Sequence, residues 1–227
     1  GEVTTPKGFK EAYQTYVEGG WPSMSHPEEF GGQGLPLSLS NAVYDMLNSN
    51  IAFTLCPMLS NGAVEALTAH ADKDMQDKFL PKLISGEWSG TMNLTEPQAG
   101  SDVGALRSTA ELIETGEHAG KYKIQGQKIY ITWGEHDLAK NIIHLVLARL
   151  PGAPEGSRGI SLFLVPKYRV NADGSLGDFN NVVLAGLNHK MGQRGTTNTL
   201  LNFGESGDCL GYLVGEENAG LKNMFHM

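Results

Sequence analysis

Two short segments combine hydroxyl groups, small residues and apolar side chains in a way that suits a ligand with a flat ring and a pyrophosphate. The first is MNLTEPQAGSD at residues 92–102, and the second is GQKIYIT at residues 126–132. In the first segment, small residues let the backbone approach a ligand closely, and exposed N–H groups with the Ser101 hydroxyl could hold a phosphate oxygen. In the second, strand alternation predicts that Tyr130 and Thr132 face the same way, so an aromatic ring could stack beside a hydroxyl.

Each segment also has a purely structural interpretation. The first could be a surface turn with an Asx-type cap at Asp102. The second could be an ordinary strand whose Tyr130 and Thr132 side chains pack against the neighbouring strand. Pro97 pushes Glu96 toward an extended conformation, so the turn is the simpler explanation of that acid. The polar residues 135–137 are expected to form a solvated turn after a strand. No acid in the chain can be assigned as a general base.

The first 87 residues are predicted to be helical. A helix around residues 9–17 places its aromatic residues on one face, and the Gly- and Pro-rich residues 21–36 are expected to be loop. Further helices are predicted from near Ser38 to Leu47, after Asn61-Gly62, and after a cap at Asp72 or Asp74. Pro81 is expected to mark a bend, because proline breaks a helix interior.

From Trp88 the hydrophobic period changes to that of strands. Residues 122–131 alternate around Gly126 and predict a hairpin. Apolar runs predict further strands at residues 142–150, 160–165, 182–184 and 199–203. Short strands separated by Gly-rich turns favour a barrel or sandwich, so the fold class is α+β, with a helical portion followed by a β portion.

Composition restricts the classes of protein to consider. The 227 residues carry a formal charge of −8, with Lys and Arg dispersed, which argues against a nucleic-acid surface in this chain. Two cysteines outside any CxxC pair make a structural zinc site improbable, and no metal site is predicted. No apolar run reaches the roughly 20 residues of a membrane span. The final residues 223–227 resemble the first turns of an amphipathic helix, and the chain is expected to be part of a longer protein.

Taken together, these segments resemble the acyl-CoA dehydrogenase family over nearly the whole chain. The resemblance rests on Leu94-Thr95-Glu96-Pro97, on Ala99-Gly100-Ser101-Asp102, and on Gly126-Gln127-Lys128 followed by Ile131-Thr132. Gly192-Gln193-Arg194 and residues 213–220 match its closing segments. Residues 131–137 resemble the longer branch, which includes 3-methylmercaptopropionyl-CoA dehydrogenases and alkylation-response flavoproteins.

The resemblance implies a domain organisation and a cofactor. It divides the chain into an incomplete helical N-terminal domain (1–87), a β-barrel flavin-binding middle domain (88–215) and the start of a C-terminal helical domain (216–227) that is otherwise absent. The implied cofactor is FAD. The residues implied to bind it are Met92, Leu94, Thr95, Gly100, Ser101, Tyr130, Ile131 and Thr132.

Several of these residues take individual roles from the resemblance. Thr95 is implied near the pyrimidine edge of the flavin, and Gly100 and Ser101 at the pyrophosphate. Ser101 also approaches the acyl-CoA, and Thr132 lies near N5, the hydride acceptor. Met92 stands where the family usually has an aromatic residue, and Tyr130 where many members have Trp. Both replacements are compatible with packing against a ring.

The expected activity is FAD-dependent oxidation of an acyl-CoA thioester to the α,β-enoyl-CoA. The family's catalytic glutamate lies in the C-terminal helical domain, so no catalytic residue is assigned here and the chain alone is expected to be inactive. An electron-transfer flavoprotein or another acceptor would take the electrons, and the full-length protein would be a homo-oligomer. The expected location is the cytoplasm, or the mitochondrial matrix of a eukaryote.

Two alternatives belong to other classes. The full-length protein could be a flavin-containing DNA-binding protein of the alkylation-response type, with little dehydrogenase activity and a basic surface on its C-terminal domain. Alternatively, the chain could be an interaction module that kept the fold and lost the cofactor. The intact Thr95, Ser101 and Thr132 argue against this last possibility.

Overall fold

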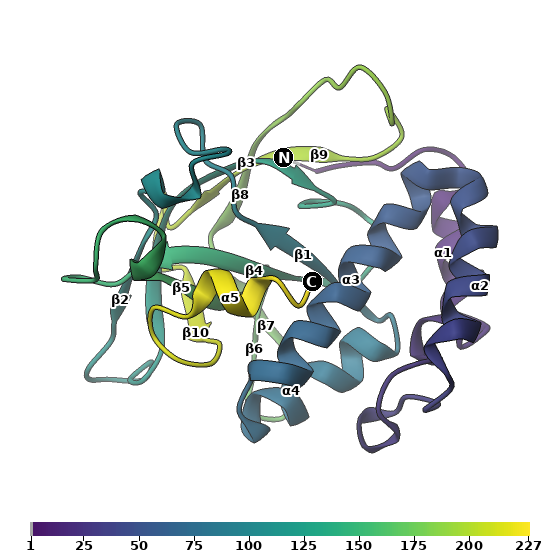
Figure 1. Cartoon of the computed structure of the whole chain (residues 1–227), viewed down its shortest axis with the longest axis horizontal. Helices are drawn as coiled ribbons and strands as arrows, with labels where there is room; N and C mark the ends of the chain where they lie inside the picture. The colour runs from purple at the N-terminus through teal and green to yellow at the C-terminus, as the bar shows by residue number, and fades with distance from the viewer. Residues whose placement is uncertain (1) are drawn as a thin grey trace.

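A helical portion precedes a β portion in the computed structural model, which describes residues 2–227 (Figure 1). The helix expected around residues 9–17 is confirmed, with Tyr13 and Tyr16 on its buried face. The 21–36 segment is mainly loop with two short 3₁₀ turns, η1 (Trp21–Ser23) and η2 (Glu28–Phe30). The helices of this portion are α1 (Phe9–Glu18), α2 (Leu37–Leu47), α3 (Ile51–His70) and α4 (Lys73–Ile84), with a 3₁₀ turn η3 (Asn48–Asn50) between α2 and α3.

The prediction that a helix begins after Asn61-Gly62 is wrong. Helix α3 starts at Ile51, where the Asn50 side chain accepts a hydrogen bond from the N–H of Phe53, and it continues without a break to His70. Gly62 does not mark a turn. A Cβ at this position would lie 3.2 Å from the backbone of Met227, so the glycine allows a segment distant in sequence to pack closely.

Helix α4 confirms one prediction and contradicts another. The Asp72 carboxylate caps the helix by accepting from the N–H of Met75 at 2.8 Å. The helix break expected at Pro81 does not occur: α4 continues through it to Ile84, with Pro81 on the exposed face while Leu80, Leu83 and Ile84 are buried. Burial of those neighbours stabilises the helix although the proline cannot donate a hydrogen bond.

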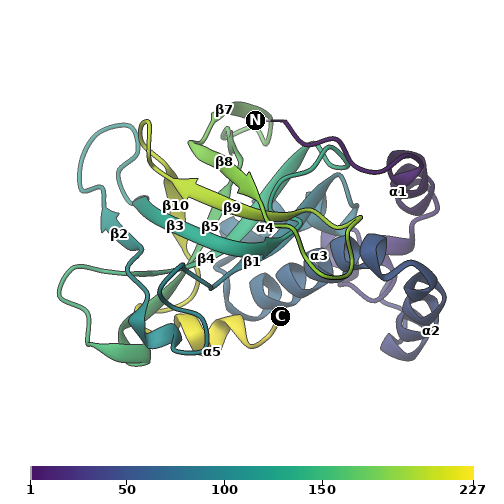
Figure 2. The ribbon, with the colours of Figure 1, turned by 90° about the horizontal axis from the view of Figure 1, so that it is seen from above.

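The β portion is a strongly curved sheet that forms a barrel (Figure 2). Its main path runs in the order β1-β4-β5-β10-β3-β9-β8, and β2 pairs with both β3 and β4. A separate two-stranded sheet contains β6 and β7. The strands are β1 (Trp88–Asn93), β2 (Thr109–Leu112), β3 (Tyr122–Thr132), β4 (Asn141–Arg149), β5 (Ile160–Pro166), β6 (Tyr168–Val170), β7 (Leu176–Phe179), β8 (Val182–Leu187), β9 (Asn198–Phe203) and β10 (Leu210–Leu213).

The hairpin predicted at Gly126 does not form. Strand β3 passes through Gly126 and changes partners there: residues 122–125 pair with β2, whereas residues 126–132 pair with β9. Gly126 has a φ of 152°, and a Cβ would lie 2.2 Å from the Ser108 Oγ. The glycine therefore allows Ser108 to approach the backbone of β3 closely at a corner of the sheet. The alternation of side chains in the sequence cannot distinguish such a corner from a turn.

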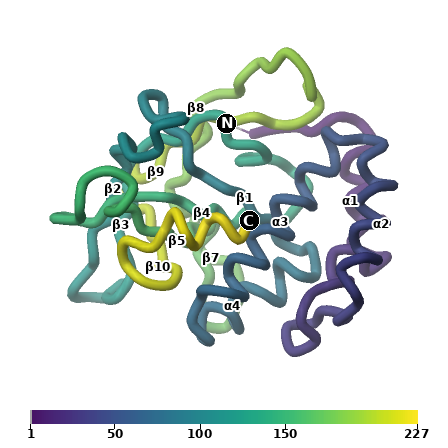
Figure 3. Tube along the Cα trace, viewed as in Figure 1, coloured from purple at the N-terminus to yellow at the C-terminus, as the bar shows by residue number. Residues whose placement is uncertain are grey.

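The helical portion covers one side of β1. Ala63, Val64 and Leu67 of α3 share a core with Trp88 of β1 and with residues of β4 and β5. A second core inside the barrel includes Ile131, Phe163 and Phe203. The short helix α5 (Gly220–Met224) packs on β5, and the 188–197 segment between β8 and β9 projects beyond the barrel (Figure 3). Within residues 2–227, no helix has the length and apolar character needed to cross a membrane.

Candidate functional site

The two segments singled out in the sequence lie side by side. Residues 94–101 follow directly from β1, and residues 126–132 form the second half of β3. The N–H of Ile129 donates to the carbonyl of Thr95 at 2.9 Å, and the Lys128 Nζ donates to the carbonyl of Leu94 at 2.9 Å. These bonds join one segment to the other, although more than thirty positions separate the paired residues.

Large apolar side chains from both segments are exposed beside this junction. Met92 retains 37% of its accessible surface, although the other residues of β1 are buried. Tyr130 retains 53%, between half-buried Ile129 and buried Ile131 in β3. Leu94 packs partly against the core. Ile131 differs, because its side chain is only 2% exposed and belongs to the barrel core. Ile131 can therefore face a surface ligand only through its backbone.

Three hydroxyls of the predicted site have no partner within the chain. Thr95 and Thr132 are half-buried and Ser101 is exposed, and none of their hydroxyls makes a hydrogen bond to another of the residues 2–227. A side chain held in a partly buried position without a partner can bond a ligand at little extra conformational cost. These hydroxyls and the exposed apolar side chains are the groups that a ring with a polar edge requires.

The backbone of β3 is distorted at Tyr130. A bulge lies between Lys128 and Ile131, and Tyr130 has a φ of 61°, which is uncommon for an aromatic residue. Exposure still alternates from Tyr130 through buried Ile131 to half-buried Thr132. The Lys190 ammonium, from the 188–197 segment, lies 5.0 Å from the centre of the Tyr130 ring. Left-handed backbone at a non-glycine residue is often found at ligand sites.

The loop after Thr95 is closed by its own backbone. The N–H of Glu96 donates to the carbonyl of Ala99 at 2.9 Å, and the N–H of Ala99 returns a bond to Glu96 at 3.0 Å. The Asx-type cap considered for Asp102 is absent, because its side chain makes no capping bond. Gly100 does not have a positive φ, and a Cβ there would meet no atom within 4 Å. Nothing in the chain itself requires glycine at position 100. A ligand that approaches the backbone closely at this point would explain the absence of a side chain.

Glu96 is not explained by the Pro97 turn, which corrects the sequence interpretation. Its side chain is 3% exposed and forms an ion pair with Lys128, whose side chain is fully buried, at 2.9 Å. Burial alone would raise the pKa of Glu96, but the charge of Lys128 and hydrogen bonds from Ser108 and Arg107 lower that pKa to about 2. A carboxylate this acidic and this enclosed is a poor general base.

The residues 135–137 are not a solvated turn either. Glu135 is buried and bonds Lys167 at 2.5 Å, and Asp137 accepts from the Thr5 hydroxyl at 2.6 Å. His136 is buried, with its Nε2 2.8 Å from the Ser89 Oγ, and burial lowers the pKa of its imidazole to about 3. The group ties the chain's first residues to the barrel. Among residues 2–227, no cluster of three or more His, Cys, Asp or Glu side chains could hold a metal ion.

Sequence reasoning assigned no individual role to Lys128. The available signal is the position of this lysine in β3, because alternation places it on the same face as Tyr122 and Ile124, which are both buried. A lysine on a buried strand face indicates a buried acceptor or counter-ion. The sequence does not reveal that the partner is Glu96.

The whole chain resembles acyl-CoA dehydrogenases in comparisons with known proteins. Residues 2–87 match the model of the acyl-CoA dehydrogenase N-terminal domain, and residues 91–205 match that of the middle domain. A 3-methylmercaptopropionyl-CoA dehydrogenase of Ruegeria pomeroyi is 48% identical over all of this chain and 38% of its own length. A butyryl-CoA dehydrogenase of Syntrophomonas wolfei is 41% identical over 99% of this chain and 37% of its own length.

Solved structures share the fold. An acyl-CoA dehydrogenase from Bacillus anthracis, complexed with FAD, aligns with a TM-score of 0.76 and 24% identity over 96% of this chain and 34% of its own. The chain thus spans little more than a third of the length of these relatives. The two matched domains, with the helical and barrel portions that carry them, place the chain in the acyl-CoA dehydrogenase family.

Proposed function

We propose that the full-length protein uses FAD to oxidise an acyl-CoA thioester to the α,β-enoyl-CoA. The main supporting observation is the junction of β3 with the segment after β1, where the exposed Met92 and Tyr130 lie beside the unpartnered hydroxyls of Thr95 and Thr132. Family membership and the dehydrogenase names of the relatives add to it. The proposal includes the domain division expected from the sequence: a helical N-terminal domain that ends at residue 87, a flavin-binding middle domain that ends at residue 215, and the start of a C-terminal helical domain.

Each residue of the proposed site takes a role that suits its chemistry. Met92, Leu94 and Tyr130 supply apolar contact for the isoalloxazine, while Thr95 and Thr132 bond its polar edge. Gly100 lets the backbone approach the pyrophosphate, and Ser101 bonds the pyrophosphate and the acyl-CoA. Ile131 contributes backbone only. When bound, FAD would supply the two-electron acceptor for the reaction.

The general base of this reaction is assigned to a part of the protein outside these 227 residues. Glu96 is committed to Lys128, and Glu135 to Lys167, so neither carboxylate is available to take a proton from a substrate. The proposed redox partner of the full-length protein is an electron-transfer flavoprotein or another electron acceptor. The protein would act as a homo-oligomer in the cytoplasm, or in the mitochondrial matrix if the source is eukaryotic.

The decisive experiment uses the full-length protein loaded with FAD and kept free of oxygen. A panel of acyl-CoAs that differ in chain length and branching is added while the absorbance of the oxidised flavin is followed. Bleaching by one class of acyl-CoA supports the proposal and identifies the substrate class. Bound flavin that no acyl-CoA bleaches would instead favour the flavin-containing DNA-binding protein.

The assignment of the site is tested separately by FAD titration of two variants. Thr132→Val and Ser101→Ala each remove a hydroxyl that has no partner in the chain, so the fold should keep its stability. Loss of one hydrogen bond to the ligand should weaken FAD binding by roughly threefold to tenfold. Unchanged affinity in both variants would show that the site is wrongly assigned, even if the protein binds FAD.

A further inference from the structure

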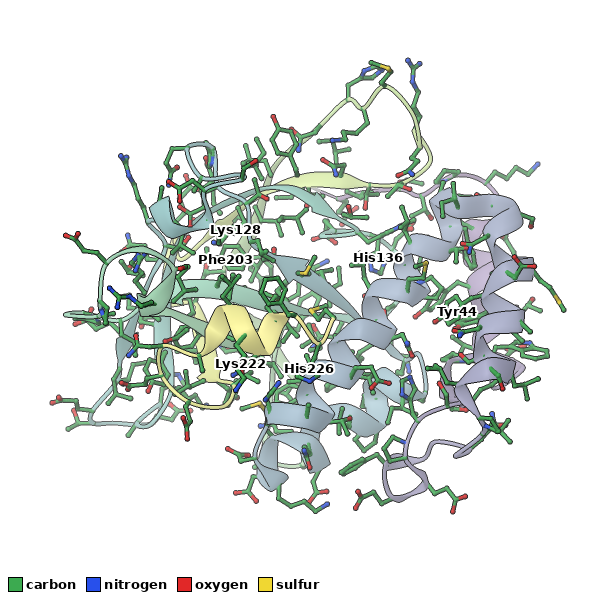
Figure 4. The ribbon with its side chains drawn as sticks, in the orientation of Figure 1. Tyr44, Lys128, His136, Phe203, Lys222 and His226 are labelled. Atoms are coloured by element: carbon green, nitrogen blue, oxygen red, sulfur yellow. The ribbon has the colours of Figure 1, made fainter. Side chains whose placement is uncertain are left out.

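Lys128 lies within the β portion (Figure 4), and it forms an ion pair with Glu96 next to the junction of the two proposed flavin segments. Both side chains are almost completely removed from solvent, and their charged atoms are 2.9 Å apart. Placing two charges in a protein interior is costly, and an apolar pair of similar volume is often as stable. A buried pair of this kind calls for an explanation other than general stability.

The carboxylate of Glu96 is surrounded by donors from three separate parts of the chain. Its Oε1 accepts from the Ser108 N–H at 3.0 Å, from the Ser108 hydroxyl at 2.6 Å and from Lys128 at 2.9 Å. Its Oε2 accepts from the Arg107 N–H at 2.6 Å and from Gln98 at 2.7 Å. The side chain is therefore held in one position and orientation.

Lys128 extends this network to the backbone of the proposed site. In addition to Glu96, its ammonium donates to the carbonyl of Leu94, and the next residue along β3, Ile129, donates to the carbonyl of Thr95. Two consecutive carbonyls of the first segment are thus fixed to two consecutive residues of the second. Tyr130 follows immediately after these anchors, at the bulge.

Gly126 completes the arrangement from the same strand. Its missing Cβ leaves room for Ser108, whose Oγ would lie 2.2 Å from a methyl group at that position, and Ser108 in turn donates twice to Glu96. Gly126 and Lys128, two residues of one motif, therefore support the same carboxylate. The Gly-Gln-Lys sequence therefore has a structural role, support of the Glu96 carboxylate, that does not depend on contact with a ligand.

We infer that Lys128 and Glu96 are positioning residues of the flavin site, which hold Leu94 and Thr95 at a fixed place against the part of β3 that carries Tyr130 and Thr132. The inference rests on the proposed function. Removing the ammonium frees the Leu94 carbonyl and leaves Glu96 without its counter-charge. The spacing between the two segments would then vary, and a flat ligand that contacts both would bind less tightly.

The test compares three variants of the full-length protein with the wild type. Lys128→Met removes the ammonium at similar volume, and Ser108→Ala removes only the hydroxyl bond to Glu96. Lys167→Met is the control, because it breaks a second, partly buried Lys–Glu pair of the barrel, in which Lys167 bonds Glu135. Each protein is titrated with FAD well below its melting temperature, and the absorption spectrum of the bound flavin is recorded.

We expect the loss of FAD affinity to differ among the three variants. Lys128→Met should weaken FAD binding by about tenfold or more and shift the bound-flavin spectrum, and Ser108→Ala should weaken it by about threefold. Lys167→Met should lose thermal stability to a similar extent as Lys128→Met but keep wild-type affinity and spectrum. If Lys128→Met does not fold, Ser108→Ala decides the question.

Two results would overturn the inference while leaving the proposed function intact. One is wild-type affinity and spectrum in both Lys128→Met and Ser108→Ala. The other is an equal loss of affinity in Lys167→Met, which would show a general effect of destabilisation. A wild-type protein that binds no FAD would instead reject the proposed function together with this inference.

Discussion

At the scale of single residues, substitution by alanine should lower the stability of the fold at one glycine and the affinity for FAD at another. A Cβ at Gly126 would collide with Ser108, whereas a Cβ at Gly100 would meet open space. Gly126→Ala should therefore lower the free energy of unfolding by more than about 2 kcal/mol. Gly100→Ala should leave thermal stability unchanged but weaken FAD binding, since the methyl group would obstruct a close ligand. Melting curves and FAD titrations check both, and a stable protein with wild-type affinity at Gly100→Ala would contradict the assigned pyrophosphate contact.

Glu96 should contribute to the acid sensitivity of the protein. Its pKa falls from the usual 4.5 to about 2 in the folded state. A carboxylate with a lowered pKa stabilises the fold above about pH 4.5, and this contribution, about 3 kcal/mol, is lost as the pH falls toward 2. Acid unfolding followed by circular dichroism should be less steep between pH 5 and pH 2 for Glu96→Gln than for wild type. Glu155→Gln, at an exposed loop carboxylate, should match the wild type, and a Glu96→Gln curve of wild-type slope would refute the argument.

At the scale of secondary-structure elements, the start of α4 depends on one side chain. Asp72 accepts the N–H of Met75 at 2.8 Å, and α4 carries Phe79, Leu80 and Leu83 into the core shared with β1. Asp72→Ala should cost about 1 kcal/mol and lower the melting temperature by a few degrees. Asp74→Ala, in the same turn but without a capping bond, is the control and should cost less. Equal losses would mean that the helix dipole, rather than the cap, is the source of the effect.

At the scale of the whole molecule, the 227-residue chain alone should not turn over acyl-CoAs even when supplied with FAD. Its buried carboxylates, Glu96 and Glu135, are held by lysines, and it spans little more than a third of the length of its relatives. The expected result is no enoyl-CoA in an anaerobic assay in which the full-length protein produces it. Enoyl-CoA formation by the 227-residue chain would place the general base within these residues.

The sequence by itself determined the family, the α+β class and the positions of five of the ten strands within residues 2–227, β3, β4, β5, β8 and β9, because these depend on local periodicity and on motifs that are contiguous in the chain. The tertiary structure decided the features that depend on contacts between distant segments. Asn61-Gly62 and Gly126 resembled turns, but their glycines permit close approach by Met227 and Ser108. Likewise, Glu96 looked like part of a surface turn until its partner Lys128, thirty-two positions away, was placed beside it. Local patterns describe the conformations a residue favours, whereas burial and counter-ions are properties of the folded chain as a whole.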